Sequence, residues 1–186
     1  GLSPDGKTIR WPGDGSQWTI SGIQEACEKA WHFQVGSCEL RVAPPCALIY
    51  LKFFAAHDRP EDRKNKDTQD IHFLLKHYVD VTGKTRLLAG GCDGDVMPKV
   101  GGELSRAAAW LAGRDMGRIL ADGSAAALAA ILRTETASQS RSHIAHSMCA
   151  HCNGDFGKAR ALLQALRDGF EEVRRKRNCS NRRPPA

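Results

Sequence analysis

The strongest constraint on the fold of this chain is a lysine that interrupts an otherwise apolar helix. After Pro44 and Pro45 the sequence predicts a helix with almost no polar face, and Lys52 lies within it. Such a helix is largely buried, and an unpaired buried charge is very costly, so the ammonium must reach the protein edge or meet an acid. Lys52 therefore needs a partner. The apolar residues of this helix are Leu48, Ile49, Leu51, Phe53, Phe54 and Ala55.

The next predicted helix offers that partner. Asp67 lies four residues before Ile71 on its apolar face, and Asp70 also falls on the inward side. We therefore predict that the side chains of Lys52 and Asp67 approach within about 6 Å, close enough for charge coupling. Two interpretations are open: a structural ion pair with Asp67 at a helix N-terminus, or part of a functional site. The apolar face repeats at spacings of three, four and seven through Ile71, Leu74, Leu75 and Tyr78.

The same stretch carries the residue pattern of a known family. A K-x-x-A-x-x-D-R run is followed by K-D-x-x-D-[IL], which resembles the second half of the nucleotidyltransferases that include the AbiEii and AbiGii toxins. Residues 1–31 look like the strand, turn and short helix that follow the metal-binding strand in that family. Residues 107–120 and 155–170 look like its C-terminal helices. The matching residues are Lys52, Ala55, Asp58, Arg59, Lys66, Asp67, Asp70 and Ile71.

This resemblance implies a polymerase-β-like fold and transfer of a nucleotide from a nucleoside triphosphate to an RNA end or a protein hydroxyl. It implies that Lys52 contacts the triphosphate and that Asp67 orients it or helps position the acceptor. It also implies that Arg59, Lys66 and Asp70 bind substrate. The family's Gly-Ser turn and its acids for Mg²⁺ lie upstream of the matched stretch. This chemistry needs carboxylates that hold metal ions. We therefore expect this chain to be an incomplete portion of the protein and to be inactive alone.

The resemblance also implies partners: a nucleoside triphosphate, RNA or tRNA, and an antitoxin protein, as in phage-defence toxin-antitoxin pairs. The competing hypothesis is a noncatalytic remnant that binds nucleic acid or a partner through its helical half and basic tail. Glu39, on the strand before Pro44, has two interpretations. It stands either near the place where related folds keep a third metal acid or on the outward face of its strand.

The order of predicted elements indicates an α+β fold, with a partial nucleotidyltransferase-like sheet and helices followed by an all-helical C-terminal region. Short strands are predicted at 8–11 and 18–20, and one longer strand at 33–42. Ser21 and Gln24 fit a helix capping box. We divide the chain into a core portion 1–89, a linker 90–102, a helical domain 103–173 and a basic disordered tail 174–186.

Five potential metal donors crowd into one stretch near the C-terminus and end in a Cys-x-x-Cys spacing. That pattern is found in zinc sites, but here every donor comes from a single segment. We therefore predict no metal and at most two donors converging, with a small zinc-binding module as the alternative. The donors are His143, His146, Cys149, His151 and Cys152.

Charge is unevenly distributed. The net charge is +6, and the tail is rich in arginine, so it is predicted either to attract phosphate backbones or only to increase solubility. Inside a predicted helix, Arg114 and Asp115 are predicted either to bridge the two folded portions or to contact nucleic acid.

Composition sets the remaining limits. At 186 residues and 41 % hydrophobic content the chain is able to bury a substantial core. No apolar run approaches the roughly 20 residues that cross a bilayer, and the seven cysteines are odd in number and scattered. We expect a cytoplasmic protein with reduced thiols and no membrane partner.

Overall fold

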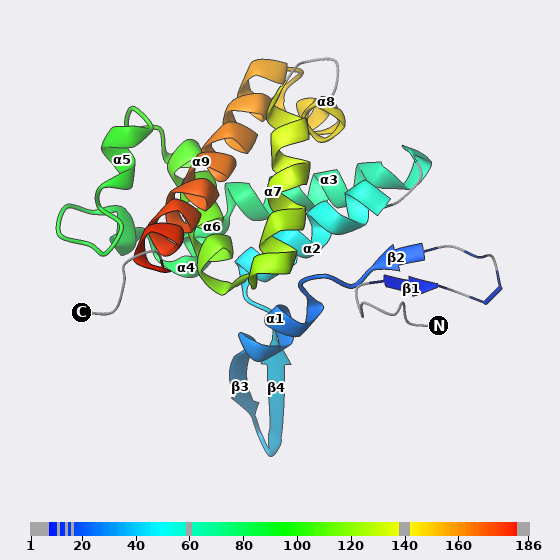
Figure 1. The fold of residues 1–186 in the computed structure, drawn as a ribbon. Coiled ribbons are helices and arrows are strands. Elements are labelled where there is room, and N and C mark those ends of the chain that lie inside the picture. The colour runs from blue at the N-terminus through cyan, green and yellow to red at the C-terminus, as the bar shows by residue number, and fades with distance from the viewer. Residues whose placement is uncertain are drawn as a thin grey trace.

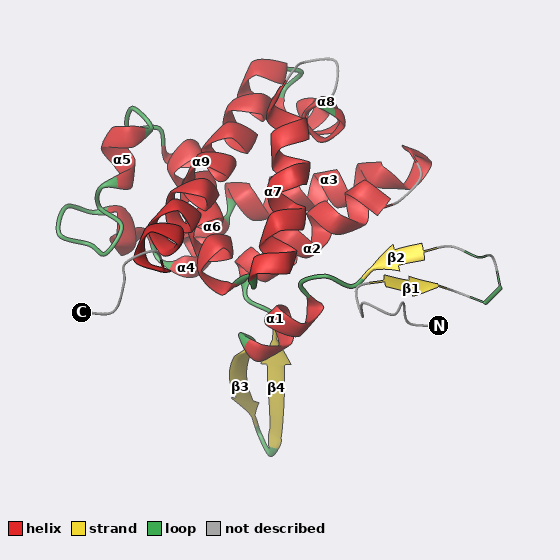
Figure 2. Cartoon of the chain, in the orientation of Figure 1, coloured by secondary structure: helices red, strands yellow, loops and turns green. Residues whose placement is uncertain are grey.

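The computed structural model describes residues 8–10, 12–13, 15, 17–58, 61–137 and 142–181, with the backbone alone at 61–64 and 180–181. It is about 70 % helical, with two small antiparallel sheets and a helical C-terminal region (Figure 1). This confirms the predicted α+β class. Figure 2 shows the strands outside a body made of helices.

The described strands form two separate ribbons and not one partial sheet of the nucleotidyltransferase type. β1 (Thr8–Arg10) pairs antiparallel with β2 (Gln17–Thr19), and β3 (Trp31–Val35) pairs antiparallel with β4 (Cys38–Val42). The prediction of one strand over residues 33–42 is wrong. The chain reverses at Gly36, whose φ of +59° is a conformation that glycine adopts readily in tight turns.

One face of the β3–β4 ribbon is apolar. Trp31 pairs with Val42 and Phe33 pairs with Leu40, so these four side chains lie on one side of the ribbon. Each is exposed, with Phe33 at 46 %. The ribbon projects away from the helical body (Figure 1).

The helix α1 (Ile23–Glu28) begins after Gly22, and the predicted Ser21–Gln24 capping box does not form. Gly22 is the N-cap, at φ +85°, without a side-chain cap. A Cβ at this position would lie 2.5 Å from the Tyr50 ring, and the Tyr50 hydroxyl donates a 2.8 Å hydrogen bond to the Gly22 carbonyl oxygen. Packing against Tyr50 therefore decides where this helix begins, and it requires glycine there.

The long apolar helix is present as predicted. α2 (Pro45–Asp58) packs against α3 (Glu61–Lys76), and its Ile49, Tyr50 and Phe53 have no exposed surface. Because α2 is buried on most sides, a charged residue within it must find a partner inside the protein.

The closest helix packing involves α6 (Leu104–Ile119) and α9 (Phe156–Asn181), which lie along each other. A Cβ at Gly113 would lie 2.0 Å from the Leu166 carbonyl oxygen, and one at Gly169 would lie 2.1 Å from the Trp110 carbonyl oxygen. Only glycine allows such an approach of two backbones. The remaining elements are α4 (Tyr78–Thr82), η1 (Lys84–Leu87), α5 (Val96–Lys99), α7 (Asp122–Ala137), α8 (His143–Cys149) and η3 (Ala150–Cys152).

The predicted core portion and helical domain share one hydrophobic core. α2 contacts α6 and α7, and α3 contacts α6 and α8. The predicted linker contains α5 and two side chains without exposed surface, Asp93 and Val96. Residues 90–102 therefore belong to the packed body, and the structure does not divide into two modules at this point.

The prediction of a disordered tail is wrong for residues 174–181, because α9 continues to Asn181. Residues 182–186 lie outside the described part of the chain. Arg177 donates hydrogen bonds of 3.0 to 3.1 Å to the carbonyl oxygens of Gly117, Arg118 and Leu120, at the end of α6. The last carbonyls of a helix lack partners within it, so this guanidinium gives the basic segment a structural role.

Candidate functional site

The structure brings together the three charged residues that the sequence placed inside. The Lys52 ammonium lies 3.0 Å from Asp67 Oδ1 and 2.6 Å from Asp70 Oδ2, which confirms the predicted approach of Lys52 and Asp67. Asp67 and Asp70 are three residues apart on α3, so both carboxylates face the same point of α2. We call these three residues the Lys52 cluster.

Burial within the Lys52 cluster is graded. The Asp67 side chain has no exposed surface, while the side chains of Lys52 and Asp70 are 31 % and 38 % exposed. Burial by itself lowers the pKa of Lys52, but the hydrogen bonds to Asp70 and Asp67 outweigh it, so the pKa lies above its ordinary value of 10.5. In the Lys52 cluster one ammonium therefore contacts both carboxylates.

A shallow hollow of about 420 Å³ opens beside Asp70. It lies between α3 and η3, and Asp70 is the residue that it shares with the Lys52 cluster. We call it the α3 groove. Lys66, also predicted to bind substrate, is exposed at its edge. The residues that line the α3 groove are Lys66, Gln69, Asp70, His72, Phe73 and His151.

The other residues of the family pattern have different positions. Arg59 lies outside the described residues. Asp58 ends α2, and its Oδ2 accepts a 2.7 Å hydrogen bond from the backbone N–H of Thr19, which ties β2 to the helical body. Asp58 therefore has a structural task in this chain.

Sequence reasoning missed the rings of the α3 groove. The His72 and His151 rings stack with centroids 5.9 Å apart, and Phe73 is 60 % exposed. One signal was available, because Phe73 lies outside the inward spacing set by Ile71 and Leu75. His151 was considered only as a zinc donor, and only the tertiary structure places it against α3.

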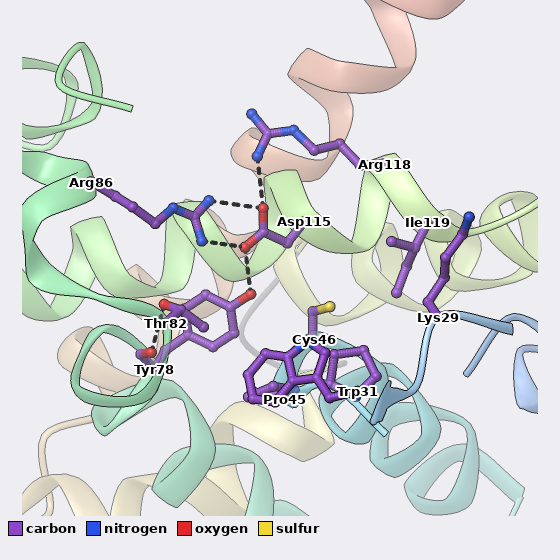
Figure 3. A pocket seen from close by; sticks show the side chains of 11 residues that line it. Lys29, Trp31, Pro45, Cys46, Tyr78, Thr82, Arg86, Asp115, Arg118 and Ile119 are labelled. Atoms are coloured by element: carbon purple, nitrogen blue, oxygen red, sulfur yellow. Dashed lines mark hydrogen bonds and ion pairs between the residues drawn. The ribbon is translucent and has the colours of Figure 1, made fainter. Parts of the chain in front are cut away.

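A second charged cluster lies where α4, η1 and α6 meet, beside a hollow of about 360 Å³. In Figure 3 three side chains converge on Asp115. Its carboxylate accepts hydrogen bonds from the Tyr78 hydroxyl at 2.7 Å, from Arg86 at 2.8 and 2.9 Å, and from Arg118 at 2.7 Å. At the side of this hollow, burial and then the Asp115 charge raise the pKa of Cys46 to about 12, so the thiol stays protonated at neutral pH.

This second cluster extends to Arg114, whose side chain is only 5 % exposed. Arg114 contacts Asp93 at 3.1 Å, Asp95 at 2.6 Å and Glu172 at 2.8 Å, which joins α6 to residues 93–95 and to α9. Asp115 therefore joins the portion 1–89 to the helical portion as predicted, through Tyr78 and Arg86, whereas Arg114 joins α6 to residues 93–95 and α9. We call the whole set the arginine network: Arg86, Arg114, Arg118, Lys99, Lys176, Asp93, Asp95, Asp115 and Glu172.

The contacts of Glu39 and of the predicted metal-donor stretch are those of structural residues. Glu39 lies on β4 with its side chain 59 % exposed and paired with His32, as expected of an outward strand glutamate. Within the donor stretch, His146 packs against Phe156 at 4.5 Å and His151 against His72. Among the described residues, no group of three or more His, Cys, Asp or Glu side chains is arranged to hold a metal ion.

Comparisons with known proteins gave no match to a family model, to a curated protein or to a solved structure. None of the helices within the described ranges combines the length and apolar character needed to cross a membrane. All seven cysteines are free thiols.

Proposed function

We propose that this chain supplies the lysine-and-acid part of a nucleotidyltransferase site of the AbiEii toxin type, which transfers a nucleotide from a nucleoside triphosphate to an RNA end or a protein hydroxyl. One observation carries the proposal. Lys52 lies between Asp67 and Asp70, at 3.0 and 2.6 Å, and these residues match the family's lysine and acids. A structural ion pair needs one carboxylate, whereas this arrangement adds a second one that reaches the surface.

The burial gradient suggests a separate task for each residue. Asp67, fully buried, fixes the position of the ammonium from behind. Lys52 and Asp70 are part exposed, so the ammonium is able to neutralise phosphate charge while Asp70 turns toward an acceptor hydroxyl. The Lys52 ammonium stays charged at neutral pH because its pKa is raised.

The described residues do not fit a Mg²⁺ site of their own. Magnesium needs carboxylates that are available to bind it, and both Asp67 and Asp70 contact the Lys52 ammonium. The proposal therefore gives this chain charge neutralisation and orientation, and it derives no step through a metal.

The test incubates the full-length protein that contains this chain with each labelled nucleoside triphosphate, Mg²⁺ and total RNA. Transfer of the label is then measured. Lys52→Ala and Asp67→Ala should each lower transfer at least about a hundredfold, which corresponds to roughly 2.7 kcal/mol. Lys84→Ala is the control, because Lys84 forms an exposed ion pair with Asp80 in another part of the protein. If transfer is unchanged in folded Lys52→Ala and Asp67→Ala protein, the Lys52 cluster is structural.

A second candidate is a module that binds nucleic acid or a partner protein, such as an antitoxin, without transferring a nucleotide. The observation in its favour is that the Lys52 ammonium already engages both acids, while the adjacent α3 groove presents rings and a cation. Saturable RNA binding by full-length protein, with no transfer of any nucleotide, would favour this candidate.

A further inference from the structure

The α3 groove combines three rings on a small surface. His72 and His151 are stacked with an interplanar angle of 26°. Phe73 lines the same groove, packs against His77 with ring centroids 4.7 Å apart, and keeps 60 % of its surface exposed. A large apolar side chain gains nothing from such exposure in the free protein. Flat, accessible ring faces are what successive bases of a single strand stack on.

The state of His72 suits this use. Its partial burial, followed by electrostatic repulsion from His151, Lys76 and His77, lowers the pKa of His72 below its ordinary value of 6.5. The imidazole is therefore neutral at pH 7 and offers an uncharged ring.

Polar groups at the edge of the α3 groove give it a lining that suits a nucleotide. Gln69 and Asp70 lie about one turn before His72 and Phe73 along α3, and Lys66 lies about two turns before them. The Lys66 side chain is exposed, and among the described residues it forms no ion pair, so its ammonium is available to a phosphate. The Gln69 amide has both a donor and an acceptor for a base edge.

The two walls of the α3 groove are fixed relative to each other. The Ser147 hydroxyl on α8 donates a hydrogen bond to Asn65 Oδ1 at 3.0 Å and lies 2.5 Å from the Thr68 hydroxyl oxygen, so the segment leading to His151 is tied to α3. A site that is formed before binding loses less conformational entropy when a ligand arrives. The volume of about 420 Å³ suits one or two nucleotides and not a duplex.

We propose that the α3 groove binds single-stranded nucleic acid, with bases stacked on Phe73 and the two histidine rings and a backbone phosphate against Lys66. This inference rests on the proposed function in one respect: it makes the bound strand the acceptor that Asp70 approaches. The binding itself does not depend on transfer, so the two are tested separately.

The test is fluorescence anisotropy of the full chain with labelled eight-nucleotide strands of RNA and DNA and with a duplex of the same sequence. Single strands should bind at least about tenfold more tightly than the duplex. Phe73→Ala should weaken that binding at least about tenfold, because base–aromatic stacking is lost. Phe33→Ala is the matched control, since Phe33 is also an exposed phenylalanine but lies on the β3–β4 ribbon.

Charge and stacking are separated by two further measurements. Lys66→Ala should weaken binding and reduce the slope of log affinity against log salt by about one. A 2-aminopurine in the strand should lose fluorescence on binding to the wild-type chain and keep it with Phe73→Ala. RNA tighter than DNA would indicate that a 2′-hydroxyl is recognised, whereas equal affinity would indicate stacking and phosphate contacts alone.

Three results would overturn the inference: no binding by the wild-type chain, equal loss in Phe33→Ala and Phe73→Ala, or unchanged affinity in Phe73→Ala. If full-length Phe73→Ala transfers nucleotides normally and binds strands normally, the α3 groove fails while the proposed function stands. If strands bind at the α3 groove but Lys52→Ala changes no transfer, the proposed function fails while the groove stands.

Discussion

The arginine network and the Lys52 cluster both join separate elements through ion pairs, yet their ion pairs are arranged differently. Each acid of the arginine network contacts at least two cations; Asp93, for example, meets Arg86, Arg114 and Arg118. In the Lys52 cluster the Lys52 ammonium contacts both acids, and the cluster lies beside an open groove. A set in which every acid meets several cations holds a fold together, whereas a partly exposed ammonium close to a hollow is accessible to an anionic ligand. Burial alone does not separate the two, because Asp67 and Asp93 are equally inaccessible.

The largest expected effect concerns stability. Arg114→Ala should lower the free energy of unfolding by about 3 kcal/mol, because Asp93 and Glu172 lose their most buried cation and keep only more exposed ones. Urea denaturation measures this, with Lys84→Ala as a control that should change little. If Lys52→Ala is as destabilising as Arg114→Ala while transfer per folded molecule is unchanged, the contrast between the two clusters is lost.

The second prediction separates structure from chemistry within the Lys52 cluster. Lys52→Met should destabilise the protein by leaving the buried Asp67 carboxylate without its ammonium, and adding Asp67→Leu should restore much of that stability. Transfer by the full-length double variant should nevertheless remain at least about a hundredfold below wild type, or roughly 2.7 kcal/mol. Urea denaturation and the labelling assay on the same preparations give both values. Recovery of transfer together with stability would show that the pair only supports the fold.

The third prediction is that the two clusters lose their contributions to stability at opposite ends of the pH scale. Burial alone raises the pKa of Asp93, but hydrogen bonds from Arg86 outweigh it and lower the pKa from 3.8 to about 2. Its stabilising contribution is therefore present above about pH 4 and is lost as pH falls toward 2. The pKa of Lys52 is raised above 10.5, so its contribution is complete below that pH and is lost as pH rises through the folded-state value.

Urea midpoints measured from pH 2 to 11 test this difference. Between pH 4 and 2, Arg86→Ala should lose less stability than wild type, because Asp93 has then already lost the hydrogen bonds that lower its pKa. Above pH 10.5, Lys52→Met should lose less than wild type. Parallel curves for wild type and both variants would contradict the assignment.

The smallest expected effect concerns the basic end of α9. Arg177→Ala should destabilise the protein by about 1 kcal/mol through lost hydrogen bonds to the end of α6. Arg175→Ala should change stability less, because its one described hydrogen bond, to Glu171, is long at 3.4 Å. Thermal unfolding of both variants decides whether the basic segment is structural as well as charged.

The pairing of Lys52 with Asp67 was predictable because it follows from local periodicity. The apolar residues around Lys52 force its helix inward, and the spacing from Asp67 to Ile71 places the acid on the inward face of the next helix. The α3 groove was only half predictable. Lys66 and Asp70 belong to the same helix as Asp67, while His151 is more than 70 residues farther along the chain.

The amino-acid sequence by itself determined the α+β class, the buried helix and the charged partner of Lys52, because these depend on which faces of single elements are apolar. Tertiary structure decided where elements end and which distant residues meet. α1 begins after Gly22 because the Tyr50 ring occupies the position that a Cβ would take. α9 continues into a basic segment in which Arg177 donates hydrogen bonds to the last carbonyl oxygens of α6. Such features depend on contacts between residues far apart in the chain. The periodicity and composition of a single segment do not predict these contacts.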